Sequence, residues 1–124
     1  MHTDYGKIVR KARVDAGITM AQMAISMGVS PAYLSAMECG KRNVSEAWLD
    51  RTKCFFRERH GLIVEGLECA ADISNQTVDL SNLSGSHRFL VASLARLKSL
   101  SPDLELEFRK LLGTAEPHNE ANAK

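Results

Sequence analysis

The chain has 124 residues and a mass of 13.7 kDa; 44% of its residues are hydrophobic and 25% are charged. This length fits one globular domain or a small domain with an appendage, and the apolar fraction excludes a disordered chain. It also excludes large enzyme folds such as a barrel of about 250 residues. No apolar run approaches the ~18 residues of a membrane span, and the N-terminus lacks the apolar core of a secretory signal. We therefore expect a cytoplasmic protein with no membrane partner.

The formal net charge of +1 conceals an asymmetry between the two halves of the chain. Residues 1–60 carry ten Lys and Arg against six Asp and Glu, whereas residues 61–124 carry six against nine. A basic half favours a polyanion as its partner. The acidic half favours self-association or contact with another protein.

Short helices that end at glycines are predicted for the start of the chain. Apolar residues at helical spacing predict a helix over 5–16, and Gly17 supplies the left-handed residue that ends it. Thr19 is the expected N-cap of a helix over 20–27, which ends at Gly28.

Two further helices follow in the same half. Ser30 caps the first, and Pro31 stands at the first helical position, where the missing N–H costs least. This helix is predicted over 31–38, and Ser45 caps another over about 46–59. The residues expected in the core are Met23, Ala24, Met27, Val29, Leu34, Met37, Leu49, Thr52, Phe55 and Phe56.

The second half has a different pattern. A helix is predicted over 62–73, although Gly66 weakens it. The alternation over 76–80 places Val78 and Leu80 on one side, which is typical of a short strand or an extended linker. A single strand is not stable alone, so it either pairs with a second copy of the chain or is only an extended arm.

Two more helices and a tail complete the prediction. Ser86 caps a helix over 87–99, and Ser101 followed by a proline begins another that ends at Gly113. Residues 114–124 are expected to be a disordered tail. The domain prediction is thus a helical domain over 1–73, an extended segment with C-terminal helices over 74–113, and the tail.

The segment Tyr5–Phe56 resembles the Xre/Cro family of helix-turn-helix regulators, which have lambda-repressor-like DNA-binding domains. The similarity lies in the stretches YGKIVRKARVDAGIT and MAQMAISMGVSPAYLSAMECGKR and in the helix from Ser45. The positions that match the family pattern are Arg13, Gly17, Ile18, Thr19, Met23-Ala24, Gly28-Val29-Ser30, Leu34-Ser35 and Glu38 with Gly40-Lys41. The resemblance covers roughly 40% of the chain and implies an all-α fold.

The resemblance also implies roles for individual residues. In this family the exposed side of the third helix contacts base edges in the major groove of double-stranded DNA. The implied base-contacting residues are Ser30, Pro31, Ala32, Tyr33, Ser35 and Ala36. The implied phosphate-contacting residues are Thr19, Gln22, Lys41, Arg42 and Arg10. Arg13 and Glu38 occupy positions that form a structural ion pair between helices in relatives.

The chain departs from the family at two points. Many relatives have Gln where this chain has Met20, and that Gln supports a phosphate contact. The base-contacting face also lacks an Arg or Lys that could bind guanine through two hydrogen bonds. We therefore expect specificity to rest on few base contacts, on DNA shape and on a symmetric second half-site.

The acidic, leucine-rich second half is the predicted dimerisation element, because two units on one face of a duplex bind tightly and selectively. The expected seam consists of Val78, Leu80, Leu94, Leu97, Leu104, Phe108 and Leu111. The sequence thus predicts an all-α, dimeric transcriptional repressor of phage or mobile-element type. An alternative is a DNA-binding antitoxin whose acidic half binds a toxin, and a third is a scaffold that reuses the fold without binding DNA.

The sequence offers no pattern typical of a metal site, a cofactor site or a catalytic site. Cys39, Cys54 and Cys69 form no C-x-x-C pair, and we expect them to be reduced and mostly packed. The four histidines are scattered without a pair at i, i+4, which argues against a metal site. No nucleophile–base set and no glycine-rich phosphate loop is present, so we expect neither catalysis nor a cofactor.

Overall fold

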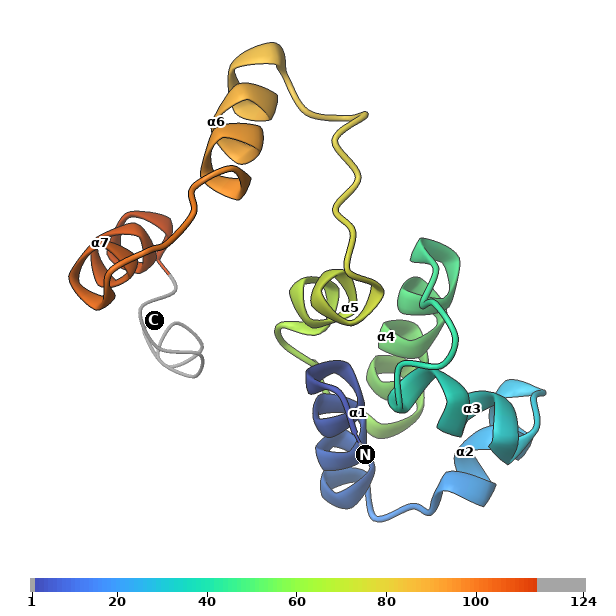
Figure 1. Ribbon diagram of the computed structural model, residues 1–124. Helices are drawn as coiled ribbons and strands as arrows, with labels where there is room; N and C mark the ends of the chain where they lie inside the picture. Colours follow the sequence, from blue (N-terminus) through green and yellow to red (C-terminus); the bar gives the residue numbers. More distant parts are fainter. Residues whose placement is uncertain (1, 114–124) are drawn as a thin grey trace. The chain divides into compact units, whose positions relative to one another are not determined.

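The computed structural model describes residues 2–113, which contain seven α-helices and no strand (Figure 1). The all-α prediction is confirmed over this range. The predicted tail over 114–124 lies outside the described residues. No helix among them combines the length and apolar character that crossing a bilayer requires. The helices are α1 (Asp4–Ala16), α2 (Met20–Met27), α3 (Pro31–Glu38), α4 (Glu46–His60), α5 (Leu67–Asn75), α6 (Gly85–Ala95) and α7 (Pro102–Leu112).

The chain forms two compact units, Met1–Val78 and a second that begins at Asp79. The first unit extends beyond residue 73, where the sequence placed its end, because α5 runs to Asn75. The Asn75 side chain binds the backbone of Val44 in the same unit. This contact ties the last turn of α5 to the loop before α4.

Local capping explains where the helices of the first unit begin. Thr3, Thr19, Ser30 and Ser45 each accept a hydrogen bond from a backbone N–H in the first turn of the helix they precede. Such caps satisfy donors that have no partner inside the helix. The predicted bounds of α2 and α3 are therefore confirmed to the residue.

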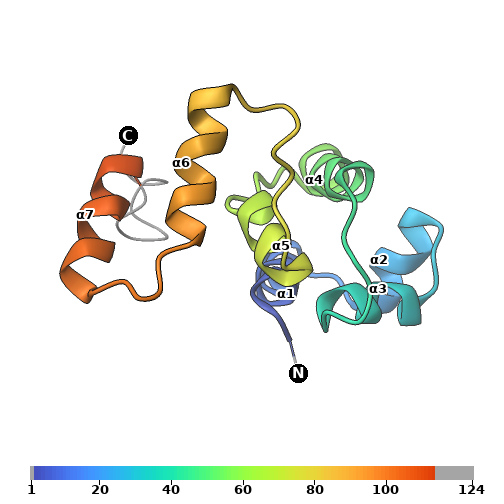
Figure 2. The ribbon, with the colours of Figure 1, turned by 45° about the horizontal axis from the view of Figure 1, so that its top comes forward.

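The core of the first unit lies between α1 and the four helices that follow it. α1 packs against α3, α4 and α5, and α2 packs against α3; Figure 2 shows α5 lying over α1. The predicted core residues are buried, except that Val29 is half-buried and packs against the core. The buried apolar side chains are Tyr5, Val9, Ala12, Met23, Ala24, Met27, Leu34, Met37, Val44, Trp48, Leu49, Phe55, Phe56, Leu67, Ala70 and Ala71.

The predicted helix over 62–73 is wrong at its start, because α5 begins only at Leu67. Gly61 ends α4 in the left-handed conformation, and the chain then runs on without helix to Gly66, which has a φ of 73°. Within this segment Leu62 and Val64 are half-buried against the core, whereas the residues after each are exposed. This alternation with a period of two fits an extended chain.

The predicted strand over 76–80 is absent from the described part of the chain. Gln76 closes α5 with a φ of 60°, and residues 77–80 form a connecting segment without regular structure. Ser81 then donates its N–H to the Asp79 carboxylate at 2.9 Å, which turns the chain. The described residues contain no strand with which this segment could pair, and its pairing with a second copy of the chain stays a prediction.

The helices of the second unit differ in detail from the prediction. α6 starts two residues before the predicted helix because Ser84, not Ser86, caps it, and it ends at Ala95 rather than at residue 99. α7 begins and ends as predicted, with Ser101 as its N-cap and Gly113 as its C-cap. No residue of α6 or α7 is buried.

Candidate nucleic-acid interface

Helices α2 and α3 are joined by a tight turn of three residues, Gly28 to Ser30. Gly28 has a φ of 73°, which other residue types rarely adopt. The Val29 N–H donates to the carbonyl of Ala24 at 3.0 Å, and the Val29 side chain packs against the core. Ala24 is 1% exposed, and its small side chain allows the close approach of the two helices. The turn thereby fixes the angle at which α3 leaves α2.

One side of α3 packs inward and the other remains accessible. Leu34, Met37 and Glu38 are buried. The six residues predicted to contact bases lie on the accessible side: Ser30, Pro31 and Ala32 are exposed, and Tyr33, Ser35 and Ala36 are half-buried. The Ser30 hydroxyl oxygen accepts from the Tyr33 N–H at 3.1 Å, which leaves its own O–H free to donate.

The first turn of α2 presents hydrogen-bond donors at an exposed helix N-terminus. The Thr19 hydroxyl accepts from the backbone N–H of Gln22 at 3.1 Å, and the side-chain amide oxygen of Gln22 accepts from the backbone N–H of Thr19 at 2.8 Å. This capping box holds both side chains in one geometry. The Thr19 O–H and the Gln22 amide nitrogen remain as donors. A helix N-terminus carries partial positive charge, so these two predicted residues lie where an anion binds favourably.

The two predicted basic residues after α3 are held against the end of that helix. The backbone N–H groups of Lys41 and Arg42 both donate to the carbonyl of Ala36, at 2.8 and 3.2 Å. Further along the same loop, the Asn75 side chain accepts from the Val44 N–H and donates to its carbonyl, each at 2.9 Å. The loop is thus fixed at both ends, while the Lys41 and Arg42 side chains are exposed.

A series of stacked aromatic and guanidinium groups connects α3 with α4. The Arg42 guanidinium lies 4.8 Å from the centre of the Tyr33 ring, and Tyr33 meets the Trp48 ring edge to face at 5.4 Å. On the other side, Arg51 stacks on Trp48 at 4.9 Å and donates to the Met27 carbonyl at 2.6 Å. Trp48 is buried, as a packing role requires. Arg51 therefore ties the end of α2 to α4.

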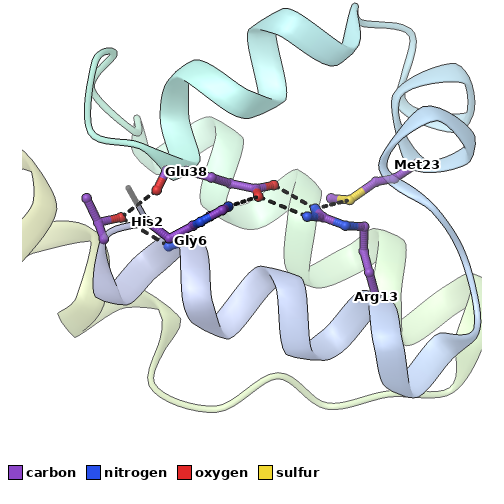
Figure 3. A network of polar contacts seen from close by, with 6 residues as sticks. His2, Gly6, Arg13, Met23 and Glu38 are labelled. Atoms are coloured by element: carbon purple, nitrogen blue, oxygen red, sulfur yellow. Dashed lines mark hydrogen bonds and ion pairs between the residues drawn. The ribbon is translucent and has the colours of Figure 1, made fainter.

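The residues that the family resemblance pairs, Arg13 and Glu38, lie in direct contact (Figure 3). The two terminal guanidinium nitrogens of Arg13, Nη1 and Nη2, donate to the two carboxylate oxygens of Glu38 at 2.6 and 2.9 Å. Arg13 is only 6% exposed and Glu38 only 1%. The same guanidinium reaches the Met23 sulfur at 3.6 Å. This buried pair joins α1 to the last turn of α3 and reaches α2.

A second contact brings the start of α1 against the end of α3. The N–H and the hydroxyl of Thr3 both donate to the Glu38 carbonyl at 3.0 Å, while that hydroxyl accepts from the Gly6 N–H. A Cβ at Gly6 would lie 2.3 Å from the same carbonyl oxygen. Only glycine allows this approach, so α3 is positioned by backbone contact as well as by charge.

The remaining residues singled out in the sequence are Arg10 and the three cysteines. Arg10 is exposed on α1, and no hydrogen bond or ion pair joins it to the described residues of α2 or α3. The cysteine prediction is partly wrong, because Cys54 and Cys69 are exposed and only Cys39 is half-buried; all three are free. Within residues 2–113, no group of three or more His, Cys, Asp or Glu side chains could hold a metal ion.

The predicted seam residues, of which Val78 ends the first unit and the others belong to the second, are all at least partly accessible. Val78, Leu94, Leu97, Leu104 and Leu111 are exposed, the last at 81%. Leu80 and Phe108 are half-buried. These side chains therefore have little cover within the described chain.

Four residues that position the surface were missed by the sequence analysis. Thr3 could have been found as a threonine before an acidic first turn, and Gly6 as a glycine inside a helical pattern, which usually has a packing reason. Arg51 and Asn75 lie 24 and 31 positions along the chain from the residues they contact, Met27 and Val44. No local pattern signals such contacts.

No family model, curated protein or solved structure matches the chain.

Proposed function

We propose that the chain is a sequence-specific DNA-binding regulator with a lambda-repressor-like helix-turn-helix domain, acting as a dimeric repressor on a palindromic operator. The observation that carries the proposal is the α2–turn–α3 unit, which has an accessible face on α3 and exposed donors at its start and after its end. Thr19 and Gln22 stand at one end, and Lys41 and Arg42 follow the other. The resemblance of Tyr5–Phe56 to the Xre/Cro family supports the same conclusion.

In this arrangement one set of residues would supply affinity for DNA and another would supply sequence specificity. Donors and cations at the two ends of the unit would contact phosphates, which fixes the register on the duplex without selecting a sequence. The Ser30 and Ser35 hydroxyls would contact base edges, and Ala32 and Ala36 would pack on thymine methyl groups. A face with so few polar groups supplies modest sequence specificity. Binding of a second chain to a second half-site would supply the additional specificity.

The test is the binding of the full chain to the DNA upstream of its own coding region and to a scrambled duplex, at two salt concentrations. We expect selective binding that weakens steeply with salt, because each neutralised phosphate releases a counterion. The variant Lys41→Ala/Arg42→Ala should lose affinity about tenfold for both duplexes and lower the salt slope by about 2. Arg57→Ala/Lys98→Ala removes the same charge at exposed positions outside α2, α3 and the loop after α3, and should change neither. Equal binding of both duplexes by the wild-type chain would refute the proposal.

A second candidate is a DNA-binding antitoxin, and the exposed apolar side chains of α6 and α7 favour it. In that case a different protein would cover them. Expression with the neighbouring reading frames, followed by purification under native conditions, separates the candidates. A stoichiometric partner protein supports the antitoxin, whereas a homodimer supports the regulator.

A further inference from the structure

Helix α7 carries an apolar stripe that is mostly uncovered in the described chain, and only Phe108 of this stripe is half-buried. Leu104, Phe108, Leu111 and Leu112 recur at helical spacing and share one side of the helix. Leu104 is 42% exposed, Leu111 81% and Leu112 70%. A stripe of this kind on a surface helix packs against another element when one is available.

The charges of α7 are ordered along its length. Acidic residues occupy the first part, namely Asp103, Glu105 and Glu107, and the basic residues Arg109 and Lys110 occupy the last turn. Two parallel copies would therefore place acidic turns side by side. Two antiparallel copies would place the acidic turns of each against the basic turn of the other, and their helix dipoles would oppose favourably.

The positions of the charged residues around α7 determine which of them would meet in an antiparallel pair. Glu105 and Arg109 lie on one flank of the apolar stripe, where an ion pair of 3.0 Å already joins them. Glu107 and Lys110 lie on the other flank. In an antiparallel pair in which Phe108 faces Phe108 of a second copy, each flank of α7 lies beside the same flank of the other copy. Glu105 then comes opposite Arg109 of the second copy. Glu107 then comes opposite the second Lys110 on the other flank.

We infer that α7 pairs antiparallel with α7 of a second copy of this chain, about a twofold axis at Phe108. A twofold interface requires a surface that is complementary to itself, and the charge order of α7 has this property. α6 lacks it, because its sequence GSHRFLVASLA contains no acidic residue. The inference deepens the dimeric part of the proposed function and rests on it.

The charge match is tested with two variants of the full chain, without DNA. Glu105→Lys/Glu107→Lys makes the flanks of α7 basic, and Arg109→Glu/Lys110→Glu makes them acidic. Sedimentation equilibrium should show that each variant alone self-associates at least about 30-fold more weakly than the wild-type chain. An equimolar mixture should recover association to within about threefold. The control Glu58→Lys/Glu65→Lys makes the same charge change at exposed positions of the first unit and should behave as wild type.

The orientation is tested by disulfide formation after Cys39→Ala, Cys54→Ser and Cys69→Ser remove the native thiols. In this background Phe108→Cys should form a disulfide-linked dimer on mild oxidation, because residue 108 faces itself. Leu104→Cys alone should not, whereas its mixture with Leu112→Cys should. Dimers of Leu104→Cys alone would indicate parallel pairing and overturn the inference.

Two further outcomes also overturn the inference: a wild-type chain that stays monomeric at tens of micromolar, and a mixture of charge variants that stays monomeric. Failure of the proposed function looks different, because a chain that dimerises through α7 but binds both duplexes equally refutes only DNA recognition. A chain that binds its upstream DNA selectively but forms no such crosslink refutes only the α7 pairing.

Discussion

In the unit Met1–Val78 the helices enclose a continuous apolar core, and a buried ion pair fixes the end of α3 against α1. In the unit that begins at Asp79, neither α6 nor α7 buries a single residue, and Phe89 is 70% exposed. Both units consist of helices, most of which begin at a Ser or Thr N-cap, so secondary structure does not distinguish them. The difference lies in tertiary packing, which supplies most helical stability in proteins. The first unit supplies its own packing, and the second has apolar surface left for a partner.

This contrast explains why the candidate interface belongs to the first unit. Contact with base edges requires side chains held in a fixed geometry, and rigid elements supported by packing provide it. α3 is held by Arg13, Thr3 and Gly6 from α1 and its cap, and by Arg51 from α4 through the end of α2. Association tolerates a less rigid surface, because its partner completes the packing.

The largest effect is expected from a substitution that removes the ion pair between α1 and α3 in the first unit. Glu38→Ala leaves the Arg13 guanidinium buried without its partner and should lower the free energy of unfolding by about 3–5 kcal/mol. Urea unfolding followed by fluorescence measures this, because Trp48 is the only tryptophan of the chain and is buried in that unit. The double variant Arg13→Met/Glu38→Leu removes both charges and should recover most of the loss. A single variant as stable as wild type would show that the pair does not hold α3.

A substitution made in both units sharpens the comparison. Gly6→Ala puts a methyl group 2.3 Å from the Glu38 carbonyl oxygen, whereas Gly85→Ala in α6 meets nothing within 4 Å. We expect the first to cost about 3 kcal/mol through overpacking, with α3 displaced. The second should not destabilise the chain, because alanine favours helix over glycine. Thermal unfolding followed by circular dichroism measures both, and similar losses in the two variants would contradict the contrast.

A smaller effect, confined to alkaline pH, comes from the core of the first unit. Burial raises the pKa of Tyr5 to about 12, and the polar side chains of Thr52 and Trp48 beside it offset only part of this rise. The pKa in the folded state thus lies above the unfolded value near 10, so folding favours the protonated phenol. This contribution is complete below pH 10 and is lost as the pH rises to 12, about 2 to 3 kcal/mol in total.

Tyr5→Phe removes that titration. Urea unfolding at pH 9 and pH 12 should show a smaller loss of stability in the variant than in the wild-type chain, since the other alkaline titrations are common to both. An equal loss in the two proteins would show that the Tyr5 hydroxyl is not buried in the folded state.

The sequence predicted most where the determining interactions are local. Thr19, Gly28, Ser30 and Pro31 fix the ends of α2 and α3 through contacts within a few residues, and these bounds were predicted to the residue. Prediction failed over 62–66, where an apolar run resembled a helix. There the left-handed Gly61 and Gly66 and the alternate burial of the chain against the core determine an extended path.

The positions of the candidate site residues were partly predictable for the same reason. The exposed side of α3 follows from helical spacing once Leu34 and Met37 are placed inward. The contacts of Arg51 with Met27 and of Asn75 with Val44 join segments far apart in the chain. They depend on how the helices pack, so no short pattern contains them. Self-association through the second unit was predicted from its apolar residues, and within the described chain no residue of α6 or α7 is buried.

The measurement that tests the account most directly is the mass of the complex between the full chain and its own upstream DNA. Sedimentation velocity with a labelled duplex, compared with a scrambled duplex at the same salt concentration, gives both selectivity and stoichiometry. We predict a complex of two chains per duplex on the upstream DNA and none of comparable stability on the scrambled one. Equal binding of both duplexes, or full affinity with one chain per duplex, would contradict the account.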